Sequence, residues 1–269
     1  MALILVTGGT GQLGRAIVAQ LAETPHVARV MSRRAAPERQ RQGQEWARAD
    51  LATGEGLAEA LDGVYVVAHC ASNPAGDTHQ SDVLGTKQLL QQARRSGVEH
   101  FLYISIVGVE RIPYTYYQHK LATELAVVES GVPYSIARVT QFHEFVDFIL
   151  QPLLSVDESP LRVPHDVLFQ SIATQDVAAL LLPYLTAEPT GRLPEMAGPA
   201  VMTLEEMAHG WLEARGRKQS LATVGDAGHL SLAPELIAGF RQGYNTAPDN
   251  ARGQITWAEF VQRRAWEKR

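Results

Sequence analysis

Short runs of apolar residues alternate with stretches of helical periodicity along the first half of the chain. The apolar runs have the length of buried strands and predict strands at Leu3–Val6, Val27–Met31, Glu45–Ala49, Val64–His69, Phe101–Ser105 and Tyr134–Val139. Apolar residues spaced three and four apart predict helices at Gly11–Glu23, Gly54–Leu61, Thr78–Ser96 and Thr115–Ser130. This alternation indicates an α/β fold with a doubly wound parallel sheet and helices on both faces.

The pattern changes after Thr140, where prolines become frequent and the strand–helix alternation becomes irregular. Helical periodicity there predicts helices at Glu144–Leu154, Thr174–Leu185, Thr203–Ala214, Pro234–Gln242 and Trp257–Trp266. Two of these helices begin with a capping-box pattern, T-L-E-E at 203–206 and T-W-A-E at 256–259. We expect residues 1–140 to form the sheet domain and residues 141–269 to form a smaller, intertwined α+β lobe that covers the substrate.

A glycine motif joins the first predicted strand to the first predicted helix. Residues 7–14 are T-G-G-T-G-Q-L-G, placed between an apolar run and a helical pattern. Free N–H groups and the positive end of a helix dipole attract phosphate at such a junction. Gly8 allows a tight turn, Gly11 lets the backbone approach a phosphate, and Gly14 lets helix and strand pack closely. The motif predicts a Rossmann-type domain that binds a dinucleotide.

The residues after the second predicted strand indicate which dinucleotide is bound. NAD-specific folds place an acidic residue there, about 20 residues beyond the glycines, on the ribose 2′-hydroxyl. Here Ser32 is followed by Arg33 and Arg34, whose hydrogen-bond donors suit a 2′-phosphate. We therefore expect NADP(H) rather than NAD(H); the alternative is that both arginines are ordinary surface charges. Asp50 and Leu51 are expected at the adenine, unless Asp50 only starts the following helix.

A tyrosine and a lysine four residues apart supply the candidate chemistry. Tyr116 and Lys120 share one face of a predicted helix. A lysine ammonium favours the phenolate of a neighbouring tyrosine, and such a tyrosine can exchange a proton with a carbinol oxygen during hydride transfer. Ser105, at the end of the fifth predicted strand, is expected to hold the substrate oxygen. Tyr117 and Tyr114 are alternatives to Tyr116.

Composition excludes several classes of protein. The chain has 269 residues with a formal net charge of −5, so no basic field is present to hold nucleic acid. It has one cysteine and nine scattered histidines, which favours neither a disulfide framework nor a metal site. No signal peptide is recognised, and no apolar run has the ~20 residues of a membrane span. We expect a cytoplasmic monomer or homodimer that acts on a small molecule.

These motifs together resemble the atypical short-chain dehydrogenase/reductase superfamily, specifically its NmrA-like NAD(P)-binding branch. The resemblance is carried by the glycine motif, by Y-I-S-I-V-G-V-E-R-I-P-Y-T-Y-Y-Q-H-K-L-A-T-E at 103–124 and by R-V-T-Q-F-H-E-F at 138–145. T-Q-D-V-A, M-A-G-P and I-T-W-A-E-F in the second half resemble later landmarks of the same branch. The resemblance covers essentially the whole chain.

The resemblance implies a set of cofactor-binding residues. At the pyrophosphate it places Gly8, Thr10, Gly11, Gln12 and Leu13. At the adenosine it places Ser32, Arg33, Arg34, Asp50 and Leu51. At the nicotinamide ribose and the substrate it places Ala71, Ser72, Lys120, Thr140, Gln141 and Phe142.

The resemblance implies an NADP(H)-dependent oxidoreductase that reduces a small carbonyl or quinone-like substrate. The branch also contains non-catalytic NADP(H) sensors that regulate a protein partner, and this alternative stays open. An epimerase or dehydratase with tightly held NAD is disfavoured by the absence of an acidic residue at Ser32. Ser105 precedes Tyr116 by eleven residues, slightly less than the spacing usual in the catalytic families, which puts its role in doubt.

Overall fold

The chain divides into two compact units. The computed structural model describes residues 1–38, 43–154, 159–225, 230 and 232–267. One unit consists of residues 1–105, 115–138 and 177–194, and the other of residues 106–114, 139–176 and 195–269. Each unit is therefore built from three segments that alternate along the chain. The sequence predicted a single boundary after residue 140, and that division stays a prediction.

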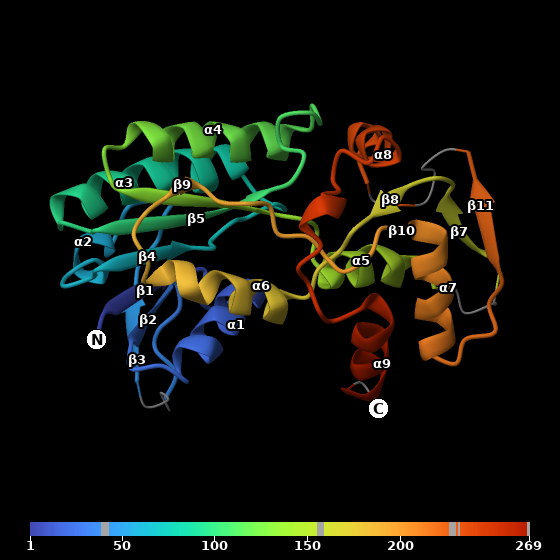
Figure 1. Ribbon diagram of the computed structural model, residues 1–269, viewed down its shortest axis with the longest axis horizontal. Helices are drawn as coiled ribbons and strands as arrows, with labels where there is room; N and C mark the ends of the chain where they lie inside the picture. Colours follow the sequence, from blue (N-terminus) through green and yellow to red (C-terminus); the bar gives the residue numbers. More distant parts are fainter. Residues whose placement is uncertain (39–42, 155–158, 226–229, 231, 268–269) are drawn as a thin grey trace. The chain divides into compact units, whose positions relative to one another are not determined.

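A seven-stranded sheet forms the centre of the first unit, with the strand order β3-β2-β1-β4-β5-β6-β9 (Figure 1). Its strands are β1 (Leu3–Thr7), β2 (Val27–Ser32), β3 (Gln44–Arg48), β4 (Val66–His69), β5 (His100–Ile106), β6 (Tyr134–Val139) and β9 (Gly191–Arg192). β1 pairs in parallel with both β2 and β4, and the pairs β2–β3, β4–β5 and β6–β9 are also parallel. This order confirms the predicted doubly wound sheet, in which the strand order reverses between β1 and β4.

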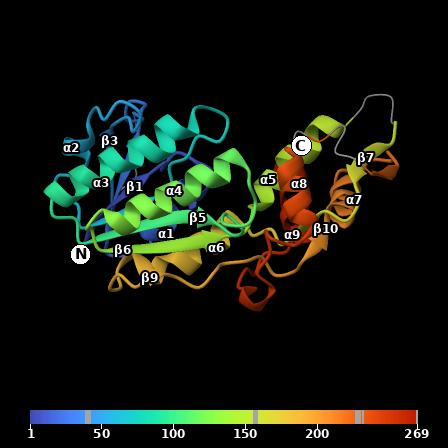
Figure 2. The ribbon, with the colours of Figure 1, turned by 90° about the horizontal axis from the view of Figure 1, so that it is seen from above.

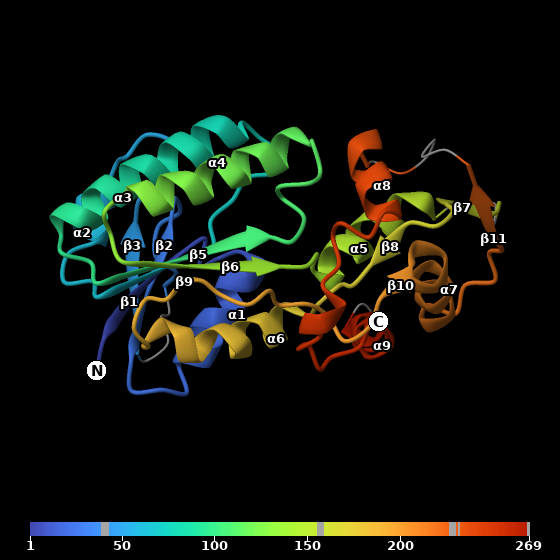
Figure 3. The ribbon, with the colours of Figure 1, turned by 45° about the horizontal axis from the view of Figure 1, so that its top comes forward.

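Helices cover both faces of this sheet. They are α1 (Gln12–Leu21), α2 (Leu57–Ala60), the π-helical η1 (His79–Leu84), α3 (Gly85–Arg95), α4 (Thr115–Glu129), α6 (Thr174–Leu181) and the 3₁₀ turn η3 (Leu182–Leu185). α3 and α4 lie side by side on one face, and α1 and α6 lie on the other (Figures 2 and 3). Burial on both faces explains why β1 and β4 are nearly continuous apolar runs.

Two sequence-based boundaries need correction. The helix predicted at 78–96 is divided, because residues 79–84 form a π-helix before the α-helix begins at Gly85. The strand predicted at Glu45–Ala49 is present as β3 at one edge of the sheet, but it begins and ends one residue earlier, at Gln44 and Arg48. Residues 39–42, between β2 and β3, lie outside the described residues.

The second unit combines helices with two small sheets. Its elements are α5 (His143–Leu150), η2 (Gln151–Leu153), β7 (Leu161–Pro164), β8 (Leu168–Phe169), β10 (Met202–Thr203), α7 (Leu204–Ala214), β11 (Leu221–Val224), α8 (Pro234–Arg241), η4 (Pro248–Asn250) and α9 (Trp257–Glu267). β8 pairs antiparallel with β10, and β7 pairs in parallel with β11. The irregular pattern of the second half therefore gives short strands rather than a second large sheet.

Both predicted capping boxes are present in the second unit. The Thr203 hydroxyl accepts from the Glu206 N–H at 3.2 Å, and the Thr203 N–H donates to the Glu206 carboxylate at 2.8 Å. Thr256 and Glu259 repeat this arrangement with distances of 3.2 and 2.9 Å. The reciprocal bonds satisfy N–H groups that the first turns of α7 and α9 would otherwise leave without partners.

Candidate functional site

The glycine motif forms a tight turn between β1 and α1. Gly8 has φ +62°, and a Cβ atom there would lie 2.8 Å from the Ala71 Cα atom. A Cβ atom at Gly14 would overlap the Gly8 carbonyl oxygen and lie 2.7 Å from the Gly9 Cα atom. At Gly11 the nearest atom to such a Cβ would be the Gly8 oxygen, 3.1 Å away. Gly8 and Gly14 are thus required by the fold, whereas Gly11 leaves space on the outer side of the turn.

The N-terminus of α1 carries the free donors that an anion needs. The first helical hydrogen bond joins the Arg15 N–H to the Gly11 carbonyl at 3.0 Å, so the N–H groups before Arg15 have no partner within the helix. Among the described residues no side chain caps this end. The end of α1 therefore fits the phosphate-binding role predicted for residues 8–13.

The residues expected at the adenosine lie at the carboxyl ends of β2 and β3. The Ser32 hydroxyl accepts from the Arg34 N–H at 3.2 Å, and the side chains of Arg33 and Arg34 are exposed. Asp50 accepts the Ala52 N–H at 2.9 Å through one carboxylate oxygen. The arginine side chains are accessible to a phosphate. The alternative for Asp50 was that it starts the following helix, but α2 begins at Leu57 with Gly56 as its N-cap.

A buried chain of hydrogen bonds joins β1 to β4 and α3. Thr7 Oγ1 lies 2.7 Å from His69 Nδ1, and His69 Nε2 lies 2.8 Å from Thr86 Oγ1. The Thr7 hydroxyl also accepts the Ala71 N–H at 3.2 Å. Burial, with a smaller effect of the Lys120 charge, lowers the pKa of His69 to about 3. His69 is therefore a neutral hydrogen-bonding residue.

Tyr116 is held in a second chain of polar groups. Its hydroxyl lies 2.8 Å from Ser72 Oγ, and the Ser72 hydroxyl donates to Asp82 at 2.5 Å. The other oxygen of Asp82 accepts from the Ser81 hydroxyl at 2.6 Å and from the Asn73 N–H at 3.2 Å. Because Ser72 has one hydrogen and gives it to Asp82, the Tyr116 hydroxyl is the donor to Ser72.

Asp82 was missed by the sequence reasoning. Its side chain is buried, and it lies in the π-helical segment η1, a rare conformation that is often found at functional sites. The signal in the sequence was an acidic residue within the helix predicted at 78–96, one of the helices expected to cover the sheet. Ser72 was predicted as a contact of the nicotinamide ribose, but its bond to Tyr116 was not foreseen.

Lys120 is buried one helical turn after Tyr116 on α4. Its Nζ atom donates to the Ile104 carbonyl at 2.6 Å and lies 4.3 Å from the centroid of the Tyr103 ring. Burial lowers the pKa of Lys120 to about 8, although the charge of Asp82 acts in the opposite direction. The ammonium group is thus close to its titration range at neutral pH.

The remaining predicted residues differ in their surroundings. Ser105 is buried, and its hydroxyl has no hydrogen-bond partner among the described residues; the serine at the Tyr116 hydroxyl is Ser72. Thr140, Gln141 and Phe142 belong to the second unit, where the Thr140 hydroxyl donates to the Gln170 carbonyl at 2.6 Å. The expected contacts of these four residues with cofactor or substrate stay predictions.

In the described parts of the chain, no group of three or more His, Cys, Asp or Glu side chains is arranged to hold a metal ion. No described helix combines the length and apolar character needed to cross a bilayer.

Comparison with protein families and known proteins gives consistent matches. A family model described as NAD(P)H-binding matches residues 8–188. Photosystem II assembly factor Ycf39 of Cyanophora paradoxa is 32% identical, over 52% of this chain and 46% of its own length. Quinone oxidoreductase 2 of Escherichia coli is 22% identical, over 84% of this chain and 79% of its own length. The chain spans only about half of the length of the first curated relatives that it matches.

Solved structures show the same fold. The crystal structure of an NADPH-dependent quinone oxidoreductase from Escherichia coli, in complex with NADPH, matches with a TM-score of 0.77. The match covers 97% of this chain and 99% of that chain at 21% identity. At this identity the likeness establishes the fold.

Proposed function

The chain belongs to the NAD(P)H-binding family, and from this we propose that it is an NADP(H)-dependent oxidoreductase that reduces a small carbonyl or quinone-like substrate. The observation that carries the proposal is the position of the Tyr116 hydroxyl, 2.8 Å from Ser72 Oγ. Ser72 lies three residues beyond the end of β4, the strand beside β1, and β1 leads into the glycine turn. A proton donor and a dinucleotide turn thus belong to the same unit.

The proposed reaction uses Tyr116 as the acid. A dinucleotide held at the glycine turn would supply the hydride for the substrate carbon. The Tyr116 hydroxyl would turn its one hydrogen from Ser72 to the substrate oxygen and give up this proton to it. Ser72 and Asp82 hold the phenol in place through the bonds of 2.8 and 2.5 Å. Lys120, held by the Ile104 carbonyl, supplies positive charge on the same helix, which favours the phenolate left after proton transfer.

The proposed cofactor preference is for NADP(H). Arg33 and Arg34 are exposed after β2 and make no ion pair with the described residues, so their guanidinium groups are available to a 2′-phosphate. The relative in Escherichia coli whose structure matches is named as NADPH-dependent, which supports the same preference.

A second candidate function is regulation of a protein partner in response to the bound dinucleotide. Relatives named as photosystem II assembly factors motivate it, because an assembly factor need not turn over a substrate. Such a protein would need the glycine turn and the arginines, but would not need a proton donor at Tyr116. The Tyr116–Ser72–Asp82 chain favours the enzyme.

One experiment tests both halves of the proposal. Thermal shifts with NADPH, NADP, NADH and NAD are measured first, and the loss of reduced-nicotinamide absorbance is then followed over a panel of carbonyls and quinones. We expect the largest shift with NADPH and turnover of at least one panel member, with Tyr116→Phe as the matched inactive variant. A preference for NADH would overturn the cofactor assignment. NADPH binding without turnover, equal in wild type and Tyr116→Phe, would favour the sensor.

A further inference from the structure

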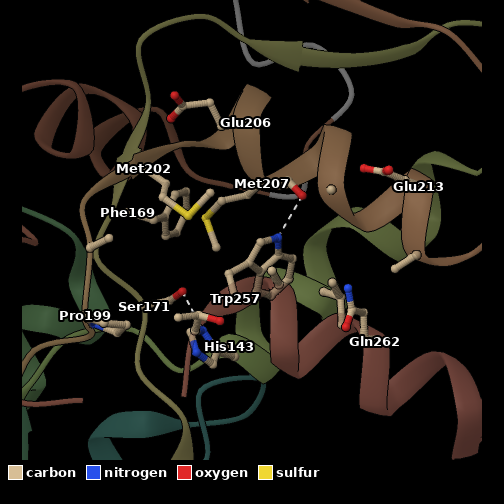
Figure 4. Close-up of a pocket in the computed structure, with 16 residues that line it drawn as sticks. His143, Phe169, Ser171, Pro199, Met202, Glu206, Met207, Glu213, Trp257 and Gln262 are labelled. Atoms are coloured by element: carbon tan, nitrogen blue, oxygen red, sulfur yellow. Dashed lines mark hydrogen bonds between the residues drawn. The ribbon is translucent and has the colours of Figure 1, made fainter. Parts of the chain in front are cut away.

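The second unit contains a half-open pocket of about 470 Å³ (Figure 4). All the residues that line it belong to this unit, so the pocket exists independently of the dinucleotide turn. Its volume falls within the range of about 300–1,000 Å³ that is usual for small-molecule sites. The pocket lies between α7 and α9, whose contact is fixed by the hydrogen bond of 2.8 Å from the Trp257 ring N–H to the Met207 carbonyl.

The inner wall of the pocket is apolar and aromatic. It is formed mainly by Phe169, Met202, Met207, Trp257 and Val261. Methionine thioethers and aromatic rings make favourable contacts with flat, polarisable groups. This wall therefore fits a ring system.

Among the polar groups that line the pocket, His143 and Ser171 favour a ligand that donates hydrogen bonds. His143 Nε2 lies 2.9 Å from the Ile255 carbonyl, which can only accept, so this nitrogen carries the proton. His143 Nδ1 then accepts from the Ser171 hydroxyl at 2.7 Å, and burial lowers the pKa of the ring, which keeps it neutral. Ser171 has thus given its hydrogen to His143, and its oxygen can only accept from a ligand.

The mouth of the pocket is negatively charged. The carboxylates of Glu206 and Glu213 project from α7 along the pocket, and none of the described residues that line it is a lysine or an arginine. Glu206 uses one carboxylate oxygen in the capping box, whereas the Glu213 carboxylate makes no hydrogen bond or ion pair with the described residues. An anion would be repelled here, and a cation would be attracted.

We propose that this pocket is a second small-molecule site, specific for an apolar ring that bears a positively charged amine. The ring lies against Trp257 and the two methionines, and the amine faces Glu213 and Glu206. This site goes beyond the proposed reductase activity and does not depend on it.

Gly210 makes the proposal open to a direct test. It lies in the middle of α7 on the pocket wall, and a Cβ atom there would meet no neighbour within 4 Å. A leucine at this position therefore projects into the pocket without displacing the core. Replacing a helical glycine also removes an unfavourable helix propensity, so the variant is expected to fold. Ala258→Leu on α9 fills the same pocket from its other wall.

The test uses two probes with the same ring and opposite charge, the ammonium ion of naphthylethylamine and the naphthylacetate anion. Binding to the full chain is measured by isothermal titration calorimetry at low and high salt. We expect the ammonium probe to bind roughly tenfold more tightly than the anion, with a smaller difference at high salt. Glu213→Gln should reduce the difference in affinity between the two probes, while the ammonium probe still binds through its naphthyl ring.

The pocket variants decide where the probe binds. Gly210→Leu and Ala258→Leu should abolish binding of the ammonium probe, while His209→Leu, on the neighbouring exposed position of α7, should bind it like wild type. Titration with NADPH should be unchanged in all three, which separates this result from the proposed function. Undiminished probe binding in both filled variants, equal affinity for the anion, or no saturable binding to wild type would each overturn the proposal.

Discussion

The hydroxyl of Tyr116 lies 2.8 Å from Ser72 Oγ, although the two residues are 44 positions apart in the chain. Ser72 follows β4, and Tyr116 is the second residue of α4, which follows β5, the parallel neighbour of β4. The carboxyl ends of neighbouring parallel strands meet at one edge of a sheet, which is where ligands bind in open α/β folds. The contact therefore marks this edge as the place where proton transfer is expected.

Removing the Tyr116 hydroxyl should separate catalysis from binding. Tyr116→Phe keeps the ring but cannot donate a proton, so we expect kcat to fall by about 10²–10⁴ while the Kd for NADPH stays nearly unchanged. Steady-state kinetics on an active panel substrate and calorimetric titration of NADPH measure the two quantities. Tyr117→Phe is the matched control, since Tyr117 is buried on the next position of α4. Full activity in Tyr116→Phe would exclude Tyr116 as the acid.

The charge of Asp82 should set the upper limit of the pH–rate profile. This charge raises the pKa of Lys120 against the larger effect of burial, which lowers the pKa to about 8. Asp82→Asn removes the charge, so the pKa of Lys120 should fall further and the decline of kcat/KM at alkaline pH should move to lower pH. Asp77→Asn, an exposed acid nearby, should leave the profile in place. An unchanged profile in Asp82→Asn would refute this coupling.

Two glycines of the turn should respond differently to alanine. Gly14→Ala forces a Cβ atom against the backbone of Gly8 and Gly9, so we expect a loss of about 1–3 kcal/mol in the free energy of unfolding. Gly11 has φ −77°, which any residue adopts, and its Cβ would meet only the Gly8 oxygen at 3.1 Å. Gly11→Ala should therefore stay stable but lose NADPH affinity, because the methyl group occupies the phosphate position. Urea unfolding and NADPH titration distinguish these outcomes.

Local sequence patterns were sufficient to predict the sheet and the glycine turn. β1 and β4 are apolar because both of their faces are buried, and the roles of Gly8 and Gly14 follow from backbone geometry that only glycine permits. Strand β9 was not predicted, because its two residues, Gly191 and Arg192, are too few to produce a pattern.

Contacts between distant segments could not be predicted in this way. The Tyr116–Ser72–Asp82 chain depends on how β4, η1 and α4 meet in space, and each of its residues also has an ordinary local interpretation. The π-helical turn at Asp82 is hidden in the sequence, because the helical periodicity continues into α3. For Ser105, the strand-end position suggested that it holds the substrate oxygen; its buried hydroxyl has no hydrogen-bond partner among the described residues, and this role stays a prediction.

The two arginines after β2 should determine the choice of dinucleotide. A charge-assisted hydrogen bond contributes about 1.5–3 kcal/mol, so Arg33→Ala combined with Arg34→Ala should weaken NADPH binding by roughly ten- to a hundredfold. Binding of NADH, which lacks the 2′-phosphate, should change little. Arg95→Ala, an exposed arginine at the end of α3, controls for a general loss of positive charge. Equal weakening of NADPH and NADH would contradict the assignment.

His69 should make the fold sensitive to acid. Its pKa is lowered from 6.5 to about 3 in the folded chain, so the unfolded chain binds more protons between these values. The stabilisation is therefore complete above about pH 6.5 and is lost as the pH falls towards 3, at up to roughly 1.4 kcal/mol per pH unit. His100, whose pKa is lowered to about 4, adds a slope of the same sign, so a comparison of variants is needed.

His69→Gln isolates this contribution. Glutamine can still hydrogen-bond to Thr7 or Thr86 but does not titrate, so the variant should be less stable at pH 7 and lose less stability on acidification. Urea unfolding at a series of pH values from 7 to 4 gives the slope of the unfolding free energy against pH for wild type and for His69→Gln. His209→Gln, at an exposed position, should follow wild type. If His69→Gln keeps the full acid slope, His69 is not the group that is protonated on unfolding, and the neutral hydrogen-bonded chain between β1, β4 and α3 does not control the acid stability of the first unit.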